Sequence, residues 1–377
     1  MSNPIHSTSA KSVLPMLAMR GLATGLCAGC VVGLLRLSHD RAAARVALWL
    51  EEWREVWWTV PIWFGVLVAL AVILRRIVRE EPLISGSGIP QTELALAGRL
   101  SFTWWRVLLA KFLGSWLALF GGLALGREGP SIQMGGAVGA GFHALWRPAA
   151  PHALTGSPYV VAGAVAGLAA AFGAPAAGVL FAFEEMKSRR DTSLIVAACA
   201  SAIGAHLMIR IVFGMGRILP FAGFEAPPLS SFWIVALEGA VFGVLGVGYN
   251  KTLLWLHDRE AGQTLIPDRW RALPPLLLAG CLALFAPLLI GGGESLIIFV
   301  GEHDVALKTL ILLLAFKYLF AQYSTVAAIP GGLLMPILCL GALWGRLWAE
   351  LPVSALAAHG LASGSVQPYV LFGMVSY

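Results

Sequence analysis

The chain has 377 residues, of which 58% are hydrophobic and only 12% are charged. A soluble protein cannot bury that much apolar surface, so the composition excludes a soluble globular domain and indicates a multi-pass membrane protein. The net charge of +6 does not indicate nucleic-acid binding, because no basic and aromatic groove pattern accompanies it.

The basic residues indicate membrane topology instead. Arg75, Arg76 and Arg79 follow one apolar segment, and Lys187 and Arg190 lie in a cluster that follows another. Short loops that remain in the cytoplasm are enriched in Lys and Arg, so we expect both clusters on the cytoplasmic side. The sequence therefore predicts an integral, multi-pass protein, and we expect it in the bacterial inner membrane.

Five cysteines are present, and Cys27 and Cys30 form a CxxC pair inside an apolar segment. No second pair completes a metal site, so we interpret these cysteines as small residues in helix packing. We expect no metal and no cofactor. The first eleven residues are polar and no clean cleavage pattern follows them, so we interpret the first apolar span as an uncleaved anchor.

Apolar helical segments follow in chain order. In the first part we expect them at Gly21–Leu35, Val56–Leu74, Val107–Leu125, Pro130–Trp146, Leu154–Phe183 and Ser193–Ile209. In the second part we expect them at Phe232–His257, Ala272–Leu289, Leu310–Gln322 and from Pro336 to about Leu351, followed by an apolar stretch to Tyr377. Arg36–Glu55 is predicted to be a charged surface helix. Gly173–Pro175 divides the longest segment into two short helices.

The loop Gly214–Leu229 is rich in Gly and Pro and is interpreted as the connector between two parts of the chain. We therefore divide the chain into an N-terminal half, residues 1–220, and a C-terminal half, residues 221–377.

The stretch Gly126–Pro130 is the first strong functional signal. It lies between two long apolar segments and places Glu128 at membrane depth, where a carboxylate is costly and indicates a functional site. Pro130 suits the first turn of a helix. The N-terminus of that helix directs free N–H groups and partial positive charge towards the loop. These features predict an anion site with an acid beside it.

An internal repeat supports this interpretation. Gly126, Pro130, Gly135 and Gly139 correspond to Gly332, Pro336, Gly341 and Gly345 at a constant offset of 206 residues (332 − 126), and Lys111 corresponds to Lys317 (317 − 111). Pro158-Tyr159-Val160 likewise matches Pro368-Tyr369-Val370. Repeated halves with broken helices are typical of secondary transporters, whose binding site lies at the repeat interface near mid-membrane. If each half crosses the membrane an odd number of times, the halves are inverted.

The period of the repeat also predicts an incomplete second half. The first half ends near Gly214, so its counterpart should end at about residue 420 (214 + 206). We expect Ala174–Glu185 and Ser193–Ile209 to lack counterparts. The alternatives are a truncated or frameshifted product and a separate chain that supplies the remaining helices.

Three loops resemble the signature loops of the CLC chloride channel/transporter family. They are Gly86-Ser87-Gly88-Ile89-Pro90, Gly126-Arg127-Glu128-Gly129-Pro130 and Gly332-Leu333-Leu334-Met335-Pro336. The resemblance covers nearly the whole chain and is greatest to the prokaryotic H+/Cl- exchanging branch. It implies an all-α fold of two inverted halves built from tilted and broken helices. It also implies a homodimer with one pore per subunit.

The resemblance implies a role for each loop. Glu128 looks like the external gating glutamate; the alternative is an acid that merely complements a helix N-terminus. Ser87 looks like the serine that holds the central chloride, and serine there favours chloride over nitrate; a simple helix N-cap is the alternative. Leu333 and Leu334 match positions whose backbone N–H groups bind the anion, and Leu334 replaces the usual phenylalanine. Gly129 is assigned to chloride binding with them.

Further residues are assigned to transport by the same resemblance. Glu185 matches the internal proton-transfer glutamate, with a solvated helix end beside the Lys187–Arg190 cluster as the alternative. Lys111 resembles a buried lysine that raises the positive potential near the pore, unless it snorkels to the interface. The pore-lining or loop-supporting set is Gly86, Gly88, Pro90, Lys111, Arg127, Pro130, Gly332 and Pro336. Lys317, Glu238 and His143 receive no role.

The leading functional hypothesis is a H+/Cl- antiporter with a glutamate gate. The alternatives are a passive gated chloride channel of the same fold and a truncated, non-transporting membrane fragment. An enzyme is not expected, because no HExxH, paired aspartates or Ser–His dyad lies at depth. The expected partners are chloride, protons and membrane lipid, with a homodimer if the missing C-terminal helices are supplied. Nucleic acid is not expected as a partner.

Overall fold

The computed structural model describes residues 6–51, 56–184, 191–219, 229–262, 264, 266–354 and 366–377. Throughout these ranges the regular structure is helical and no strand occurs, which confirms the all-α prediction. Glu185, Lys187 and Arg190 lie outside the described residues.

The first part of the chain supplies eight α-helices among the described residues. They are α1 His6–Glu51, α2 Thr59–Glu80, α3 Ile89–Leu96, α4 Trp104–Phe120, α5 Glu128–Trp146, α6 Pro158–Phe172, α7 Pro175–Glu184 and α8 Thr192–Leu207. The short helical turns η2 Pro82–Ile84 and η3 Met208–Val212 accompany them. The break at Gly173–Pro175 is confirmed, and Gly173 has the left-handed φ of 68° that ends α6.

The second part follows a similar order. Its helices are α9 Phe232–Gly262, α10 Leu273–Phe285, α11 Glu294–Glu302, α12 Leu307–Val326, α13 Leu334–Trp348 and α15 Gln367–Ser376. The short turns are η4 Leu229–Ser231, η5 Asp268–Trp270, η6 Pro287–Leu289 and η7 Ala349–Val353.

Six of the described helical stretches are long and apolar enough to cross a membrane: Leu14–Trp49, Thr59–Glu80, Thr192–Val212, Phe232–Gly262, Leu307–Val326 and Leu334–Leu351. The chain is therefore a multi-pass membrane protein, as the composition predicts. The other α-helices among the described residues are shorter than these spans or, like the 19-residue α5, less apolar.

The surface helix predicted for Arg36–Glu55 is wrong at its first residue. The segment continues the first apolar span as one helix, α1, and Leu37–Trp49 are exposed or half-buried, but Arg36 is buried. Its guanidinium donates a 2.8 Å hydrogen bond to the carbonyl oxygen of Ala170 near the end of α6. The partner carbonyl lies 134 residues away, so the sequence pattern around Arg36 could not reveal it.

Close glycine contacts join the same helix pairs in both halves. In the first half, the backbone of Gly163 on α6 touches Gly135 on α5, and the carbonyl oxygen of Tyr159 fills the place where Gly139 lacks a side chain. In the second half, Gly341 and Gly345 on α13 meet α15 in the same way. Small residues allow membrane helices to approach this closely. The packing therefore follows the repeat that the sequence indicates.

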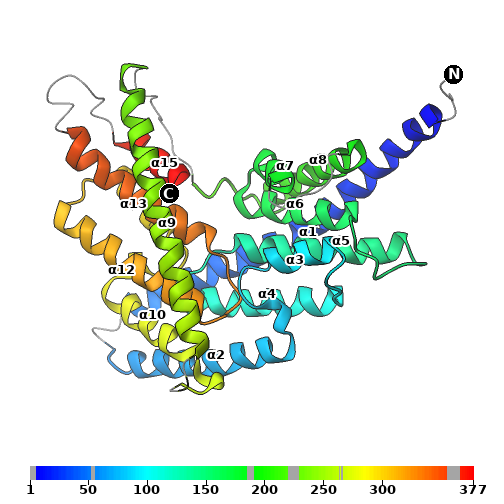
Figure 1. Ribbon diagram of the computed structural model, residues 1–377. Coiled ribbons are helices and arrows are strands. Elements are labelled where there is room, and N and C mark those ends of the chain that lie inside the picture. The colour runs from blue at the N-terminus through cyan, green and yellow to red at the C-terminus, as the bar shows by residue number, and fades with distance from the viewer. Residues whose placement is uncertain are drawn as a thin grey trace.

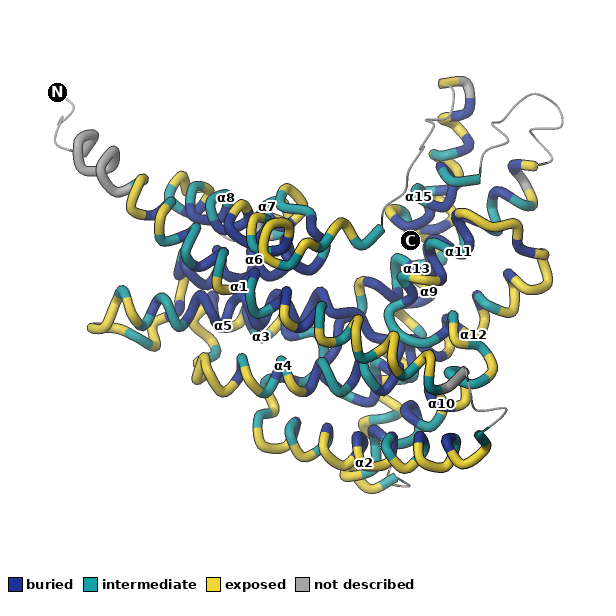
Figure 2. Tube along the Cα trace, turned by 180° about the vertical axis from the view of Figure 1, so that it is seen from behind, coloured by how far each residue is buried: buried dark blue, intermediate teal, exposed yellow. Residues whose placement is uncertain are grey.

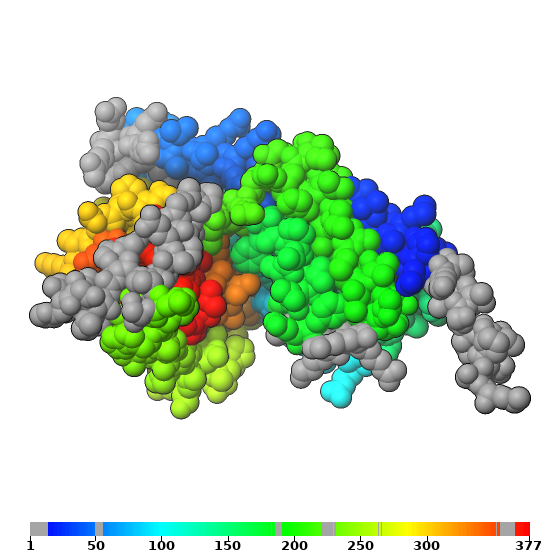
Figure 3. Space-filling view, turned by 90° about the horizontal axis from the view of Figure 1, so that it is seen from above, coloured from blue at the N-terminus to red at the C-terminus, as the bar shows by residue number. Residues whose placement is uncertain are grey.

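The helices form two groups that lie on opposite sides of the structure. Figure 1 shows α6, α7 and α8 with the start of α1 on one side, and α9, α12, α13 and α15 on the other. Figure 2 shows that α2 has exposed residues along its whole length. Figure 3 shows the α6–α8 group (green) and α15 (red) at separate positions on one face. α5 and α13 extend inwards from the two groups, so that their N-termini meet near the centre.

Candidate functional site

The loops before α5 and α13 are joined directly to each other. The N–H of Gly126 donates to the carbonyl oxygen of Gly332 at 2.7 Å, and the N–H of Gly332 donates back to Gly126 at 2.7 Å. This isolated antiparallel bridge pairs two residues that are equivalent in the internal repeat. A reciprocal pair of bonds between equivalent residues is the pattern that a local two-fold axis produces, and it supports the inverted arrangement of the halves.

The loop before α3 completes the junction. The N–H of Gly331 donates to the carbonyl oxygen of Gly86 at 3.0 Å, and the hydroxyl of Ser85 donates to Ala328 at 3.0 Å. Gly129 packs so tightly on Ser87 that a Cβ at position 129 would lie 2.8 Å from the Ser87 Cβ. Only glycine fits at position 129. The Gly-Pro sequence of the second loop is therefore required by its contact with the first loop.

Three helix N-termini thus converge on one point. In α5 the first backbone bond runs from Ser131 to Arg127, and in α13 it runs from Ile337 to Leu333. The N–H groups of the preceding residues, including Gly129 and Leu334, have no acceptor within their own helices. In α3 the N-cap is Gly88, and the N–H of Ile89 donates to the Oγ of Ser87, the residue before the cap, at 3.3 Å. Free N–H groups and aligned dipoles favour an anion at this junction.

Glu128 begins α5 at this junction and is fully buried. Its Oε2 occupies the space beside Gly126 where a side chain would otherwise lie, and a Cβ on Gly332 would be 3.5 Å from the same oxygen. Neither carboxylate oxygen makes a hydrogen bond of good geometry within the described parts of the chain, although the backbone N–H groups of Arg127 and Glu128 lie close enough to attract it. The carboxylate therefore lies folded back over the bridge between the two repeats, beside the free N–H groups.

Lys111 on α4 is buried beneath the first loop and does not snorkel to an interface. Its ammonium donates to the carbonyl oxygens of Ile84 at 2.8 Å and Gly86 at 2.7 Å. Lys317 on α12 makes the matching bonds to Leu289 and Gly291 at 2.9 and 2.8 Å. Each lysine thus satisfies two carbonyl oxygens at the helix break of its own half. This structural contact of Lys317 was not predicted from the sequence.

Backbone conformation repeats at the same breaks. Gly86 and Gly88 have φ of 66° and 91°, and their counterparts Gly291 and Gly293 have φ of 66° and 104°. These values are available to glycine at little cost. The order Gly-x-Gly before a short helix is therefore a backbone requirement in both halves.

Arg127 is the most strongly paired residue of the site. Its Nη1 lies 3.0 Å from Asp40 Oδ1 on α1, and its Nη2 lies 3.1 Å from Glu294 Oε1 at the start of α11. Neither carboxylate was predicted from the sequence as a partner of Arg127. A signal was available for Glu294, because an acid directly after Gly291-Gly292-Gly293 stands at the start of a helix, where carboxylates are favoured.

The remaining predicted residues are distributed as follows. Leu333 is half-buried at the N-cap of α13, Leu334 is exposed, Pro130 and Pro336 are buried in the first turns of their helices, and Pro90 is exposed in the first turn of α3. His143 contacts Ser157 at 2.8 Å, away from the junction. Glu238 on α9 is buried, and no hydrogen-bond partner for it occurs in the described ranges.

Residues 64–377 match the family described as "Voltage gated chloride channel". This chain belongs to the voltage-gated chloride channel family. The match covers most of the chain and includes all three loops that meet at the junction, in agreement with the resemblance to the CLC family noted from their motifs.

Two bacterial H(+)/Cl(-) exchange transporters resemble the chain over most of its length. The H(+)/Cl(-) exchange transporter ClcA of Vibrio cholerae serotype O1 is 35% identical over 331 residues, which cover 85% of this chain and 70% of that protein. ClcA of Klebsiella pneumoniae is 30% identical over 362 residues, covering 94% of this chain and 75% of that protein.

Solved structures of the family share the fold. A slow cyanobacterial Cl-/H+ antiporter superposes with a TM-score of 0.83 at 25% identity, covering 95% of this chain and 84% of that one. A eukaryotic CLC transporter superposes with a TM-score of 0.74 at 20% identity, covering 97% of this chain and 65% of that one. The arrangement of broken helices around the three-loop junction is therefore the CLC fold.

Proposed function

We propose that this protein exchanges chloride for protons across the membrane, with Glu128 as the gate. The observation that carries the proposal is the placement of the Glu128 carboxylate, buried and without a hydrogen bond of good geometry within the described structure, at the meeting point of three helix N-termini. The ClcA exchange transporters and the cyanobacterial antiporter that resemble this chain support it.

The geometry explains how one carboxylate can gate an anion path. Ionised Glu128 is itself an anion and competes with chloride for the free N–H groups at the junction. Protonation removes that charge, so the side chain loses its attraction for the helix ends and chloride can take its place. Ser87, Gly129, Leu333 and Leu334 are the proposed chloride ligands, the last three through backbone N–H groups.

Coupling requires a second group that delivers protons from the other side. We assign this role to Glu185, which directly follows α7 in the sequence. Lys111 contributes positive charge beneath the loop that carries Ser87, because its ammonium is bound to the carbonyl of Gly86, the preceding residue. The loop-supporting glycines and prolines, Gly86, Gly88, Pro90, Pro130, Gly332 and Pro336, hold the three helix starts in place.

The proposal is tested by reconstituting the purified chain in vesicles with an outward chloride gradient and no proton gradient. Chloride efflux should drive protons inwards, measured with a pH electrode while a chloride electrode records the anion. Chloride flux without proton movement would indicate a passive channel instead. The absence of both fluxes in a chain that is folded and inserted would overturn transport altogether.

We also propose a homodimer in the bacterial inner membrane, since the resemblance to the CLC family implies two subunits with one pore each. The proposed activity is transport and involves no enzymatic bond-making or bond-breaking. Cross-linking in native membranes tests the dimer: a band at twice the mass of the 377-residue chain is expected.

A further inference from the structure

We propose that Asp40 and Glu294 are positioning residues for the Glu128 gate, and that they act through Arg127 from a water-accessible cavity on the non-cytoplasmic side. The inference rests on the proposed function of Glu128. It adds to it an electrostatic clamp, defined here as Arg127 with Asp40 and Glu294.

The clamp joins three parts of the chain that are far apart in sequence. Arg127 in the gate loop binds Asp40 of α1 at 3.0 Å and Glu294 of α11 at 3.1 Å. Asp40 precedes Arg127 by 87 residues, and Glu294 follows it by 167 (294 − 127). The N–H donors of a guanidinium point outwards from different edges of one rigid plane. A single arginine can therefore fix the distance between two carboxylates.

The clamp acts on the gate through the backbone. Arg127 is the N-cap of α5, and Glu128 is the first residue of that helix. On the other side of Arg127, Gly126 is held by its two hydrogen bonds to Gly332. The gate residue therefore belongs to a short segment that is fixed by the repeat bridge and by the clamp. Loosening either one allows the α5 N-terminus to shift relative to the chloride ligands.

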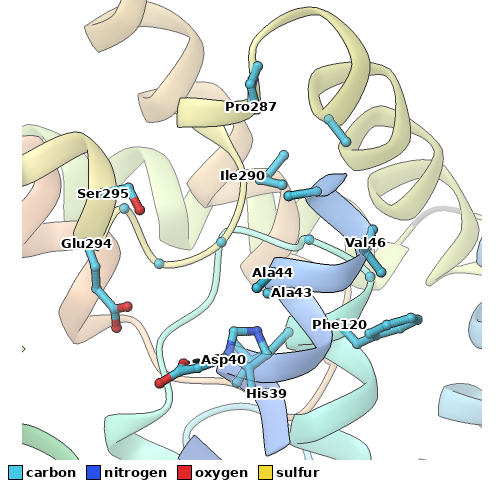
Figure 4. Close-up of a pocket in the computed structure, with 18 of the residues that line it drawn as sticks. His39, Asp40, Ala43, Ala44, Val46, Phe120, Pro287, Ile290, Glu294 and Ser295 are labelled. Atoms are coloured by element: carbon cyan, nitrogen blue, oxygen red, sulfur yellow. Dashed lines mark hydrogen bonds and ion pairs between the residues drawn. The ribbon is translucent and has the colours of Figure 1, made fainter. Parts of the chain in front are cut away.

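The two carboxylates reach water although the arginine does not. The Arg127 side chain is only 6% exposed, whereas Asp40 is 53% and Glu294 is 32% exposed. Both carboxylates line a cavity of about 680 Å³ between α1, the end of α4 and the glycine break before α11. Figure 4 shows them on the same side of this cavity, with His39 beside Asp40. Solutes in the cavity can therefore reach the outer half of the clamp.

The topology places the cavity on the side opposite the cytoplasm. Val46 and Ala47 near the end of α1 and Trp63 near the start of α2 line it. Arg75, Arg76 and Arg79 lie at the other end of α2. The positive-inside rule puts those arginines in the cytoplasm, so the cavity opens outside.

Several charges face the clamp, and their sum decides its effect on Glu128. Arg36, His39 and Asp40 come from α1, Arg127 and Glu128 from the start of α5, Glu294 from α11 and Lys317 from α12. The His39 Nδ1 lies 3.4 Å from Asp40 Oδ1, and Glu294 interacts electrostatically with Glu128 as well as with Arg127. Asp40 and Glu294 thus offset the positive charge of Arg127 beside the gate. Removing either one leaves more of that charge to favour ionised Glu128.

The test measures chloride flux against external pH in vesicles for the wild type, Glu294→Gln, Asp40→Asn and Arg127→Lys. We expect Glu294→Gln to move the midpoint of the flux–pH profile by about 1 pH unit to lower pH, because ionised Glu128 is then harder to protonate. Asp40→Asn should give a smaller shift in the same direction, since its greater exposure screens its charge.

Arg127→Lys separates positioning from charge. Lysine keeps the positive charge, but its single ammonium cannot hold both carboxylates in a fixed plane. We expect its midpoint to stay near that of the wild type while its maximal flux falls several-fold. If these three residues only stabilised the fold, every variant would have a lower maximal flux, and none would have a shifted midpoint in its flux–pH profile.

Asp268→Asn is the matched control, because it breaks another Arg–Asp pair between distant elements, Arg75 with Asp268, at the end of α2 opposite the cavity-lining Trp63. It should leave the profile unchanged. Wild-type profiles for both Glu294→Gln and Asp40→Asn would overturn the clamp, even if the wild type exchanges chloride for protons. If Glu294→Gln does not fold, the more exposed Asp40→Asn still decides the direction of the shift. A wild type without coupled flux would instead contradict the proposed function.

A final arm places Glu294→Gln in a Glu128→Gln background, which has no gate carboxylate to titrate. The shift caused by Glu294→Gln should vanish there. A shift of the same size in that background would show that Glu294 acts on another group and would overturn its assignment to the gate.

Discussion

Gly126 and Gly332 exchange two backbone hydrogen bonds of 2.7 Å each, although 206 residues separate them (332 − 126). They are equivalent positions of the internal repeat, and each stands just before the first turn of a short helix. The bond pair sets the two helix N-termini against each other. Because Glu128 lies two residues from one end of this bridge, the predictions below begin with it.

Glu128→Gln should abolish proton coupling and make chloride flux nearly independent of pH, since an amide cannot be protonated or ionised in this range. Chloride flux itself should persist, because the free N–H groups of the junction remain. Parallel chloride and proton recordings measure both effects. Glu302→Gln, at an exposed position in the last turn of α11, is the control and should retain coupled flux. Persistent proton transport in Glu128→Gln would remove the gate assignment.

Glu185→Gln should stop proton movement but leave chloride flux, because the proposed role of Glu185 is confined to the proton path. The adjacent Glu184→Gln is a close control, since Glu184 is an exposed acid at the end of α7. Proton flux driven by a chloride gradient is the readout. If both variants behave alike, Glu185 is simply a solvated acid at a helix end.

Lys111→Met and Lys317→Met should each destabilise the protein by about 2–4 kcal/mol, because each leaves two carbonyl oxygens without their donor. Only Lys111→Met should weaken chloride binding, by roughly fivefold, corresponding to about 1 kcal/mol of lost attraction. Calorimetric titration of chloride distinguishes the two. Equal losses of affinity would mean that the lysines act only through the fold.

Ala328→Gly should stabilise the protein by about 0.5–1 kcal/mol. Ala328 has a φ of 55°, the only left-handed φ of a non-glycine residue in the described parts of the chain. A left-handed alanine costs about 1–2 kcal/mol, of which the flexibility of glycine in the unfolded chain cancels a part.

Gly122, the counterpart of Ala328 in the first half (328 − 206 = 122), provides the reverse test. It has a φ of 78°, and a Cβ there would meet only ordinary contacts at 3.5 Å or more. Gly122→Ala should therefore destabilise by about 1–2 kcal/mol through backbone strain alone. Thermal unfolding of both variants in detergent is the measurement. Opposite signs are expected, and a loss of stability in Ala328→Gly would contradict the strain argument.

Asp268→Asn should cost less than about 1 kcal/mol at neutral pH, because the Asp268 side chain is 49% exposed, although that of Arg75 is only 15% exposed. The hydrogen bond from Arg75 holds the pKa of the Asp268 carboxyl below its ordinary value. The pair therefore stabilises the fold above the carboxyl's unfolded pKa of about 3.9, and this contribution is lost as pH falls through the lower folded pKa. Unfolding curves of wild type and variant should converge in acid. A constant difference at all pH values would contradict the assignment.

Much of the site could be predicted from sequence, because backbone geometry is encoded locally. Gly86 and Gly88 indicate left-handed turns, and Pro130 and Pro336 indicate the starts of helices, independently of the residues packed around them. The offset between Lys111 and Lys317 pointed to equivalent positions, and their matching bonds to carbonyls support that equivalence. The burial of Arg36 and the clamp at Arg127 escaped prediction. Their partners are 87 or more residues away, and no local pattern indicates which carboxylate or carbonyl they meet.

Local sequence patterns were enough to predict a multi-pass helical membrane protein with duplicated, broken helices, because hydropathy, glycine and proline act on neighbouring residues. They also singled out Glu128, because a charge at membrane depth is costly wherever the helix lies. The surroundings of that charge depend on the folded chain, which places Gly332 across the repeat bridge and Asp40 and Glu294 around Arg127. Electrostatic interactions depend on distance in space, and the fold alone brings these residues within bonding range.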